Sequence, residues 1–387
     1  ENEIGKEGDP MGNRILVTRS SMPPLDEYVA EIAPLWESRW LTNMGVKHRK
    51  LEEALKERLK VGNVALFTNG HTALECALEA LGLPEGREVV TTPFTFASTT
   101  HSIVRKGLVP VFADVRPSDL TLDPEAVEAA ITPRTCAIMP VHVYGNLCDV
   151  EALAEIAERH SLKLVYDAAH AFGVEWRNPS TGDWEGAASF GDASMLSFHA
   201  TKVFNTIEGG CVCFGDSTLG VELARWRNFG IAGPEDVERV GGNAKMNEFC
   251  AAMGLCNLRH LDDEVAKRKE VAERYWADLE GIPGVRAIEP AEGVSPNYAY
   301  LPVLFDPNAF GATRNDVFEA LASESVGARK YFYPLVTDFA CYRSVYSSSS
   351  TPVAKRAADR VLTLPLYADL SLEDVDRICS IVRGCAR

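Results

Sequence analysis

Lys202 and Asp167 are the two residues whose type and position best suit a role in catalysis or in ligand binding. Lys202 lies in the polar stretch SFHATKVFNTIEGG, which directly follows an apolar strand. A lysine that bonds to a carbonyl must lie close to it and lose its proton easily. Asp167 ends the apolar run in VYDAAH, and the carboxyl ends of parallel strands are where α/β sheets bind ligands. Each has a plainer interpretation when taken alone, Lys202 as a surface lysine and Asp167 as a helix cap or structural acceptor.

A candidate phosphate site is the third signal. In TNGHTALECALEAL a strand is followed by a turn at Gly70 and by a helix that begins near Thr72. Backbone N–H groups at a helix N-terminus bind phosphate, and glycine lets the chain approach it closely. The order matches neither the P-loop nor the dinucleotide fingerprint. Together with Asp167, which would keep a pyridine nitrogen protonated, and Lys202, it predicts a pyridoxal 5′-phosphate (PLP) site.

The elements that must position these residues alternate between strands and helices. Short apolar runs separated by helical patterns predict a mostly parallel sheet with helices on both faces. Residues 72–81 have the one-sided apolar spacing of a helix, and residues 124–130 form another candidate. The predicted strands are 64–67, 88–93, 109–115, 136–145, 163–170, 193–198 and 210–215.

The length predicts a large domain and a smaller one. A chain of 387 residues exceeds what one hydrophobic core usually organises. After about residue 258 a long charged helix begins, and the remainder mixes strands with helices. We expect a large PLP-binding domain over residues 13–258 and a small α+β C-terminal domain over residues 259–387. The polar residues 1–12 are interpreted as a disordered lead or a cloning remnant.

Composition narrows the possible partners. The formal net charge of −16 argues against general affinity for nucleic acid, whose phosphates are bound chiefly by Lys and Arg. The ten cysteines lack metal-ligand spacing, so we expect free thiols and no metal. No segment approaches the ~20 apolar residues of a membrane span, and the N-terminus lacks the apolar stretch of a signal peptide. These observations predict a soluble cytoplasmic protein without nucleic-acid or membrane partners.

Eight motifs in order resemble the DegT/DnrJ/EryC1/StrS family of PLP-dependent sugar aminotransferases. They are TNGHTAL, TPFTFAST, PVHVYG, VYDAAHAFG, SFHATKVFNTIEGG, GGNAKMNEFCAAMG, RKYFYPL and LTLPLY. The resemblance extends from about Pro23 to the C-terminus and implies the aspartate-aminotransferase-like fold (PLP fold type I) with a homodimeric assembly. One branch of the family has His instead of the catalytic lysine and performs dehydration. Because this sequence keeps Lys202, the resemblance favours transamination.

The resemblance implies roles around the cofactor ring. Lys202 would hold PLP as a Schiff base and then shuttle a proton between the amine-bearing carbon and the cofactor. Asp167 would pair with the pyridinium nitrogen, and His170 would contact the ring hydroxyl. His170 stands where many members of the family have Gln. Phe96 matches the aromatic residue that stacks on the ring, although core packing is its plainer alternative.

The resemblance also implies a phosphate cup and a shared site. The cup would comprise Gly70, backbone groups of His71 and Thr72, and the hydroxyl of Ser197. His71 occupies a position that is usually Thr, so a hydroxyl contact would move to Thr72. Asn243 in GGNAKM matches an asparagine that the family contributes from the neighbouring subunit, which implies a homodimer with shared active sites.

The expected substrates are a nucleotide-linked keto-sugar and L-glutamate. The sequence FHATK followed by EGG is similar to the branch that aminates C-4, which favours a dTDP-4-keto-6-deoxy-hexose as acceptor. WLTNMG (40–45) and RKYFYPL (329–335) match substrate-side segments. Lys330, Tyr331 and Tyr333 could therefore meet the diphosphate, with a tyrosine-rich packing corner as the alternative.

Other functions remain open at this point. Within the enzymes, the alternatives are aminotransferases for a 3-keto-sugar nucleotide or for scyllo-inosose, an aminocyclitol precursor. A PLP-binding regulatory protein would usually carry an added DNA-binding domain, and the sequence shows no basic helix-turn-helix segment. A nucleotide-binding α/β protein without PLP is disfavoured because the GxGxxG and Walker patterns are missing.

Overall fold

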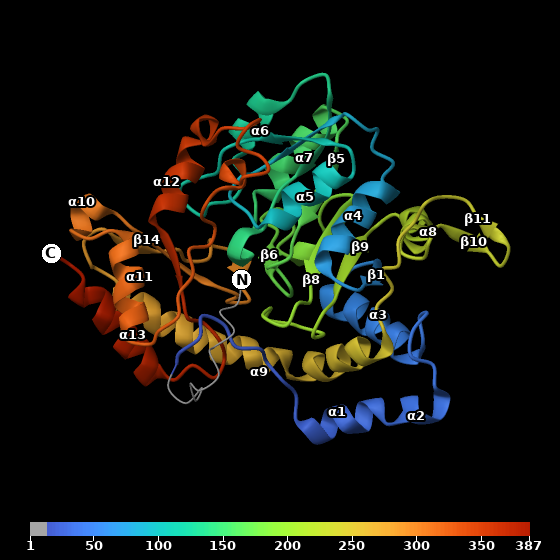
Figure 1. Cartoon of the computed structure of the whole chain (residues 1–387), viewed down its shortest axis with the longest axis horizontal. Coiled ribbons are helices and arrows are strands. Elements are labelled where there is room, and N and C mark those ends of the chain that lie inside the picture. Colours follow the sequence, from blue (N-terminus) through green and yellow to red (C-terminus); the bar gives the residue numbers. More distant parts are fainter. Residues whose placement is uncertain (1–13) are drawn as a thin grey trace.

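Seven strands form one sheet at the centre of the molecule (Figure 1). The computed structural model describes residues 14–387, so the lead predicted over residues 1–12 lies outside the described residues. Every strand of this sheet coincides with an apolar run of the sequence, and the predicted α/β fold is confirmed. In spatial order the strands are β1 (Asn63–Phe67), β9 (Gly210–Phe214), β8 (Ala193–Ser197), β5 (Lys163–Asp167), β4 (Thr135–Met139), β2 (Glu88–Thr91) and β3 (Val109–Phe112).

The strand directions bring the ends of three strands to one edge of the sheet. Strands β3, β2, β4, β5 and β8 are parallel, and β9 is antiparallel to both of its neighbours, β8 and β1. Strand β1 therefore runs in the same direction as β5 and β8. Their carboxyl ends, at Phe67, Asp167 and Ser197, lie at the edge where α/β sheets bind ligands.

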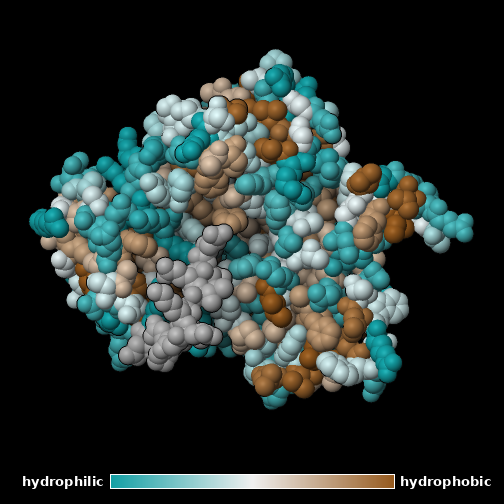
Figure 2. Space-filling view, viewed as in Figure 1, coloured by the Kyte–Doolittle hydropathy of each residue, from teal (hydrophilic) through white to brown (hydrophobic). Residues whose placement is uncertain are grey.

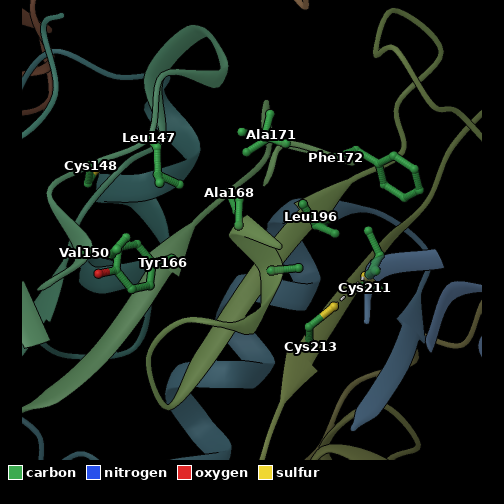
Figure 3. Close-up of a cluster of buried hydrophobic side chains, with 14 of the residues drawn as sticks. Leu147, Cys148, Val150, Tyr166, Ala168, Ala171, Phe172, Leu196, Cys211 and Cys213 are labelled. Atoms are coloured by element: carbon green, nitrogen blue, oxygen red, sulfur yellow. Dashed lines mark hydrogen bonds between the residues drawn. The ribbon is translucent and has the colours of Figure 1, made fainter. Parts of the chain in front are cut away.

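Helices cover both faces because side chains alternate along the strands. Leu66, Tyr166 and Leu196 point to the face covered by α3, α6, α7 and the first half of α9, and Figure 3 shows part of this core. Phe67 and Val165 point to the opposite face, which α4, α5 and α8 cover. The helices around the sheet are α3 (Val46–Leu59), α4 (Gly70–Ala80), α5 (Ala97–Arg105), α6 (Pro124–Ala130), α7 (Val150–Arg159), α8 (Ser217–Trp226) and α9 (Glu248–Leu279).

A second, smaller core lies beside the sheet. The antiparallel sheet β12–β14–β15 packs there with α11, α13 and the second half of α9. Ile15 also packs into this core and forms a bridge with Val326, so both ends of the chain contribute to it. Its elements and neighbours are β12 (Val285–Ala287), β14 (Leu301–Phe305), β15 (Val361–Leu364), α10 (Pro307–Phe310), α11 (Arg314–Ser323), α12 (Pro352–Arg360) and α13 (Leu372–Gly384).

Helix α9 connects the two cores without a break (Figure 1). The charge pattern predicted a helix only after about residue 258, whereas α9 begins at Glu248. Its first turns are largely buried and lack the alternating charges of the later ones, which is why that pattern did not reveal them. Leu261 packs against the large core and Val271 against the small one. The division predicted at residues 258/259 therefore falls inside a continuous helix.

Short elements complete the fold. Strands β10 and β11 form an arm that projects from the large core (Figure 1). No helix within residues 14–387 combines the length and the apolar character of a membrane span. The remaining elements are α1 (Leu25–Ile32), α2 (Pro34–Ser38), β6 (Glu175–Arg177), β7 (Trp184–Gly186), β10 (Ile231–Gly233), β11 (Asp236–Val237), β13 (Val294–Ser295) and the 3₁₀ turns Val143–Gly145, Ala187–Ser189, Val336–Asp338 and Ser348–Ser350.

Candidate active site

Asp167 is a buried carboxylate held by two hydrogen bonds at the end of β5. Thr99 donates its hydroxyl to Oδ2 at 2.7 Å, and the backbone N–H of Ala169 donates to Oδ1 at 3.2 Å. Burial raises the pKa of Asp167, while these hydrogen bonds and the charge of Lys202 act in the opposite direction. The fixed carboxylate is therefore placed to meet a cationic group at this edge of the sheet.

Lys202 lies in the loop after β8, and its Nζ points to the small sheet. Nζ donates a hydrogen bond to the hydroxyl of Tyr300 at 3.3 Å. It forms no ion pair within residues 14–387, although its charge is close enough to influence the pKa of both Asp167 and His170. The amine is thus free of a carboxylate that would hold its proton.

His170 is fixed as one tautomer by a backbone hydrogen bond. Its Nδ1 accepts the N–H of Tyr144 at 3.0 Å. Burial, followed by the charge of Lys202, lowers the pKa of His170 well below its usual range. The ring is therefore neutral at pH 7, and because Nδ1 is an acceptor, Nε2 carries the proton. Nε2–H is a suitable donor to a hydroxyl or phenolate oxygen.

The first turn of α4 offers free backbone donors beside Ser197. The Asn69 side chain caps the helix and accepts both the N–H of Thr72 at 2.8 Å and its hydroxyl at 3.0 Å. The predicted phosphate contacts of Thr72 are therefore already occupied by this cap. The N–H groups of Gly70 and His71 have no partner among the described residues, and a helix N-terminus binds anions through such groups.

The side chain of His71 is turned along the helix and towards α5. Its Nδ1 lies 2.9 Å from the hydroxyl of Ser98, and its Nε2 lies 3.4 Å from Glu75. Gly70 packs closely against the end of β8, since a Cβ at this position would lie 3.0 Å from that of Ser197. The structure thus brings Gly70, His71 and Ser197 to the edge that also holds Asp167.

Two other predicted residues, Phe96 and Asn243, have exposed side chains. Phe96 precedes α5, and its side chain is 60% exposed rather than packed in a core. Asn243 is exposed at the base of the β10–β11 arm, where its Oδ1 accepts a hydrogen bond from Lys245 at 2.9 Å. Among the described residues, neither side chain forms a hydrogen bond or an ion pair with Asp167 or Lys202.

The three residues predicted to bind substrate separate into two groups. The ring of Tyr331 lies 6.2 Å from that of Tyr300, which places it next to the partner of Lys202. Lys330 instead lies over the ring of Phe318, and Tyr333 stacks with Arg314, both on α11. Only Tyr331 of the three is therefore adjacent to the cluster around Lys202.

Three contacts of this cluster were not predicted from the sequence. Thr99 binds Asp167, Tyr144 fixes His170, and Tyr300 binds Lys202. Thr99 and Tyr144 lie inside the motifs TPFTFAST and PVHVYG, so the motifs gave a signal for them. Tyr300 lies in none of the eight motifs, and the residues around it do not indicate a contact with Lys202.

The donor set fits PLP. The buried carboxylate of Asp167 suits a protonated ring nitrogen, and Nε2–H of His170 suits the ring oxygen. Lys202 offers an amine for the aldehyde, while Gly70 and His71 offer N–H groups for the phosphate. Within the part of the chain that the structure describes, no three His, Cys, Asp or Glu side chains gather as a metal site.

Comparison with known proteins agrees with this chemistry. The model of the DegT/DnrJ/EryC1/StrS aminotransferase family matches residues 25–383. A dTDP-4-amino-4,6-dideoxy-D-glucose transaminase from Shigella dysenteriae is 41% identical over 374 residues, covering 96% of this chain and 99% of that protein. A protein of the same name from Escherichia coli is 38% identical, covering 96% of this chain and 98% of that protein.

A solved structure shares the whole fold. DesI, crystallised in the presence of its TDP-sugar product, superimposes with a TM-score of 0.90 and 34% identity, covering 98% of this chain and 95% of DesI. The aminotransferase PseC from Helicobacter pylori has a TM-score of 0.88 at 27% identity, covering 96% of this chain and 99% of PseC. The agreement extends over both cores and over the edge that carries Asp167.

Proposed function

Because this chain belongs to the DegT/DnrJ/EryC1/StrS aminotransferase family, we propose that it aminates a dTDP-linked 4-keto-6-deoxy-hexose at C-4. The product would be the 4-amino-4,6-dideoxy sugar. The observation that carries this proposal is 41% identity over nearly the full length of a transaminase named for that sugar. The arrangement of Asp167, His170 and Lys202 supplies the chemical groups that amino transfer needs.

The chain's residues would each act on a different part of PLP. When bound, PLP supplies an aldehyde that bonds to amines and a ring that withdraws electrons from the adjacent carbon. Asp167 would hold the ring nitrogen protonated, and His170 would donate Nε2–H to the ring oxygen. Gly70 and His71 would bind the phosphate through backbone N–H groups, next to the Ser197 hydroxyl.

Lys202 would move the proton in both halves of the reaction. We propose L-glutamate as the amine donor, which leaves as 2-oxoglutarate. Lys202 would take the proton from the carbon that bears the donor amine and return a proton to the cofactor. With the keto-sugar as acceptor, the same amine would move the proton in the opposite direction, so that Lys202 is regenerated after each cycle.

A homodimer with shared sites completes the proposal. The β10–β11 arm and its flanks expose apolar side chains that a second copy could bury, namely Phe229, Ile231, Val237 and Val240. Figure 2 shows apolar surface in this region. Asn243 lies at the base of the arm, and no hydrogen bond among the described residues joins it to Asp167, His170 or Lys202. Lys245 donates a hydrogen bond to Oδ1 of Asn243. The amide N–H groups of Asn243 therefore remain available to the phosphate of a cofactor bound in the partner subunit.

The substrate assay compares dTDP-4-keto-6-deoxyglucose, a 3-keto isomer and scyllo-inosose, each with glutamate as donor. We expect the 4-keto nucleotide sugar to be aminated with a kcat/KM at least about tenfold above the others. Preference for either of the other acceptors would overturn the C-4 assignment. Lys202→Ala should lose both amination and the visible absorbance of lysine-bound PLP. A Lys202→Ala protein that keeps this absorbance would contradict the assignment of the lysine.

A further inference from the structure

We propose that Tyr300 is a positioning residue that holds the amine of Lys202 whenever this amine is not bonded to the cofactor. Its hydroxyl accepts the hydrogen bond from Lys202 Nζ at 3.3 Å, and Nζ also lies 5.7 Å from the centre of the Tyr300 ring. No other hydrogen bond of Nζ occurs within residues 14–387. Tyr300 is thus the group that determines where the free amine points.

The Tyr300 ring is itself held by aromatic neighbours. It lies 4.7 Å from the ring of His170, 6.0 Å from Tyr144 and 6.2 Å from Tyr331. Tyr144 also donates its hydroxyl to the carbonyl of Tyr331, which links two of these neighbours. A ring packed in this way has little rotamer freedom, so its hydroxyl occupies a fixed place.

Tyr300 lies where the chain passes from the large core into the small sheet. It directly precedes β14, whose residues Leu301 and Val303 are buried in that core, whereas Lys202 follows β8 of the large sheet. The Tyr300 ring itself packs against the large core, so the hydrogen bond joins the segment that leads into the small sheet to the loop after β8. The way in which the small core packs against the large one would therefore determine the position of the Lys202 amine.

The chemistry gives this contact a function. A lysine amine sits on a flexible four-carbon stem, and each time it leaves the cofactor it must stay near the carbon whose proton it moves. The Tyr300 hydroxyl can accept from the charged amine and donate to the neutral one, so it retains Nζ in both states. Tyr300 neither gains nor loses a proton overall, and the balance of the transfer is unchanged.

The matched variants are Tyr300→Phe and Tyr298→Phe. The first removes the hydroxyl and keeps the packed ring. The second removes a hydroxyl two residues away, where the ring lies 6.1 Å from Trp276 of α9 and the hydroxyl has no hydrogen-bond partner among the described residues. Tyr298→Phe should therefore behave as wild type, and it controls for the loss of a tyrosine hydroxyl from this segment.

The first readout needs no turnover. In cofactor-free Tyr300→Phe, covalent uptake of PLP, followed by absorbance, should be at least about threefold slower than in wild type. The affinity for pyridoxamine 5′-phosphate, which cannot bond to the lysine in this way, should be unchanged. Weaker binding of pyridoxamine 5′-phosphate would instead assign a general structural role to the hydroxyl and overturn the proposal.

The second readout is the proton transfer, and it rests on the proposed function. With glutamate and the preferred keto-sugar, Tyr300→Phe should lower kcat about tenfold or more with little change in KM. Deuterium at the α-carbon of glutamate should slow the variant more strongly than it slows wild type. Normal kcat and isotope effect in Tyr300→Phe would overturn the inference alone. An inactive wild-type protein would instead contradict the proposed function.

Discussion

At the scale of single residues, burial and hydrogen bonding determine the protonation and the donor or acceptor role of each group around Lys202. The hydroxyl proton of Thr99 goes to Asp167, so Thr99 must accept from the hydroxyl of Thr95, which lies 2.8 Å away. Thr95 and Thr99 thus form a directed chain that ends on the carboxylate. Burial favours the neutral form of both His170 and Asp167, and for Asp167 the hydrogen bonds from Thr99 and Ala169 act against it.

His142 predicts how stability depends on pH. It is fully buried, its ring stacks on Tyr166, and its Nδ1 accepts the N–H of Cys148 at 3.1 Å. Burial lowers the pKa of His142 from 6.5 to about 3. Between about pH 3 and pH 6.5, His142 therefore carries an extra proton in the unfolded chain but not in the folded one. His142 alone should therefore lower the free energy of unfolding by about 1.4 kcal/mol for each unit by which the pH falls within this range.

Urea unfolding at several pH values between 4 and 6 measures this contribution. In His142→Asn the amide oxygen can still accept the Cys148 N–H, but the titrating ring is gone, so the slope should be smaller by about 1.4 kcal/mol per pH unit. His199→Asn is the control, because the ring of His199 is exposed in the folded protein. An unchanged slope in His142→Asn would show that His142 does not titrate between the two states.

At the scale of elements, the start of α4 and the end of β8 must lie close together to form the phosphate cup. A Cβ at Gly70 would lie 3.0 Å from both Met195 Sδ and Ser197 Cβ. Gly70→Ala should therefore push the two elements apart, lower the free energy of unfolding by about 1–3 kcal/mol, and weaken binding of pyridoxamine 5′-phosphate.

Gly215→Ala is the matched control for Gly70→Ala. Gly215 directly follows β9, and a Cβ there would meet no atom within 4 Å. Thermal unfolding and fluorescence titration with pyridoxamine 5′-phosphate compare the two variants. If Gly70→Ala bound this ligand as tightly as wild type, the cup would not depend on the close approach of α4 to β8.

At the scale of the whole molecule, the proposed shared site can be tested by mixing subunits. Lys202→Ala and Asn243→Ala should each be nearly inactive alone. In a mixed dimer, one site carries both defects and the other carries neither. After random exchange of equal amounts of the two variants, half of the dimers are mixed, and each mixed dimer has one intact site out of two. Activity should therefore recover to about a quarter of the wild-type value.

Recovery on mixing distinguishes shared sites from independent ones. If Asn243 acted within its own subunit, every site in the mixed dimer would carry one defect, and mixing would restore nothing. Subunits mixed without exchange, kept as separate homodimers by brief incubation, provide the control. Exchange of subunits should require time, because the apolar side chains that are exposed on and beside the arm, such as Val240 at 95% exposure, would be buried in the proposed dimer and would have to separate first.

The fold class could be predicted from the sequence, and the sequence also provided the candidates for the reacting groups. Strand and helix periodicity are local properties, so the seven strands of the sheet could be predicted from their apolar runs. Gly70, Asp167 and Lys202 follow strands whose ends must meet at one edge, and the motifs identified the family. The pattern failed at the start of α9, where a buried helix lacks an amphipathic period.

Which side chains contact one another at this edge of the sheet depends on how distant segments of the chain pack together. Tyr300 and Lys202 are 98 residues apart in the sequence, and no local pattern specifies how their two segments pack against each other. Tertiary packing also turns Lys330 towards Phe318 of α11 rather than towards Lys202. Contacts of this kind depend on three-dimensional packing and directional hydrogen bonds, which the order of residues along the chain does not reveal.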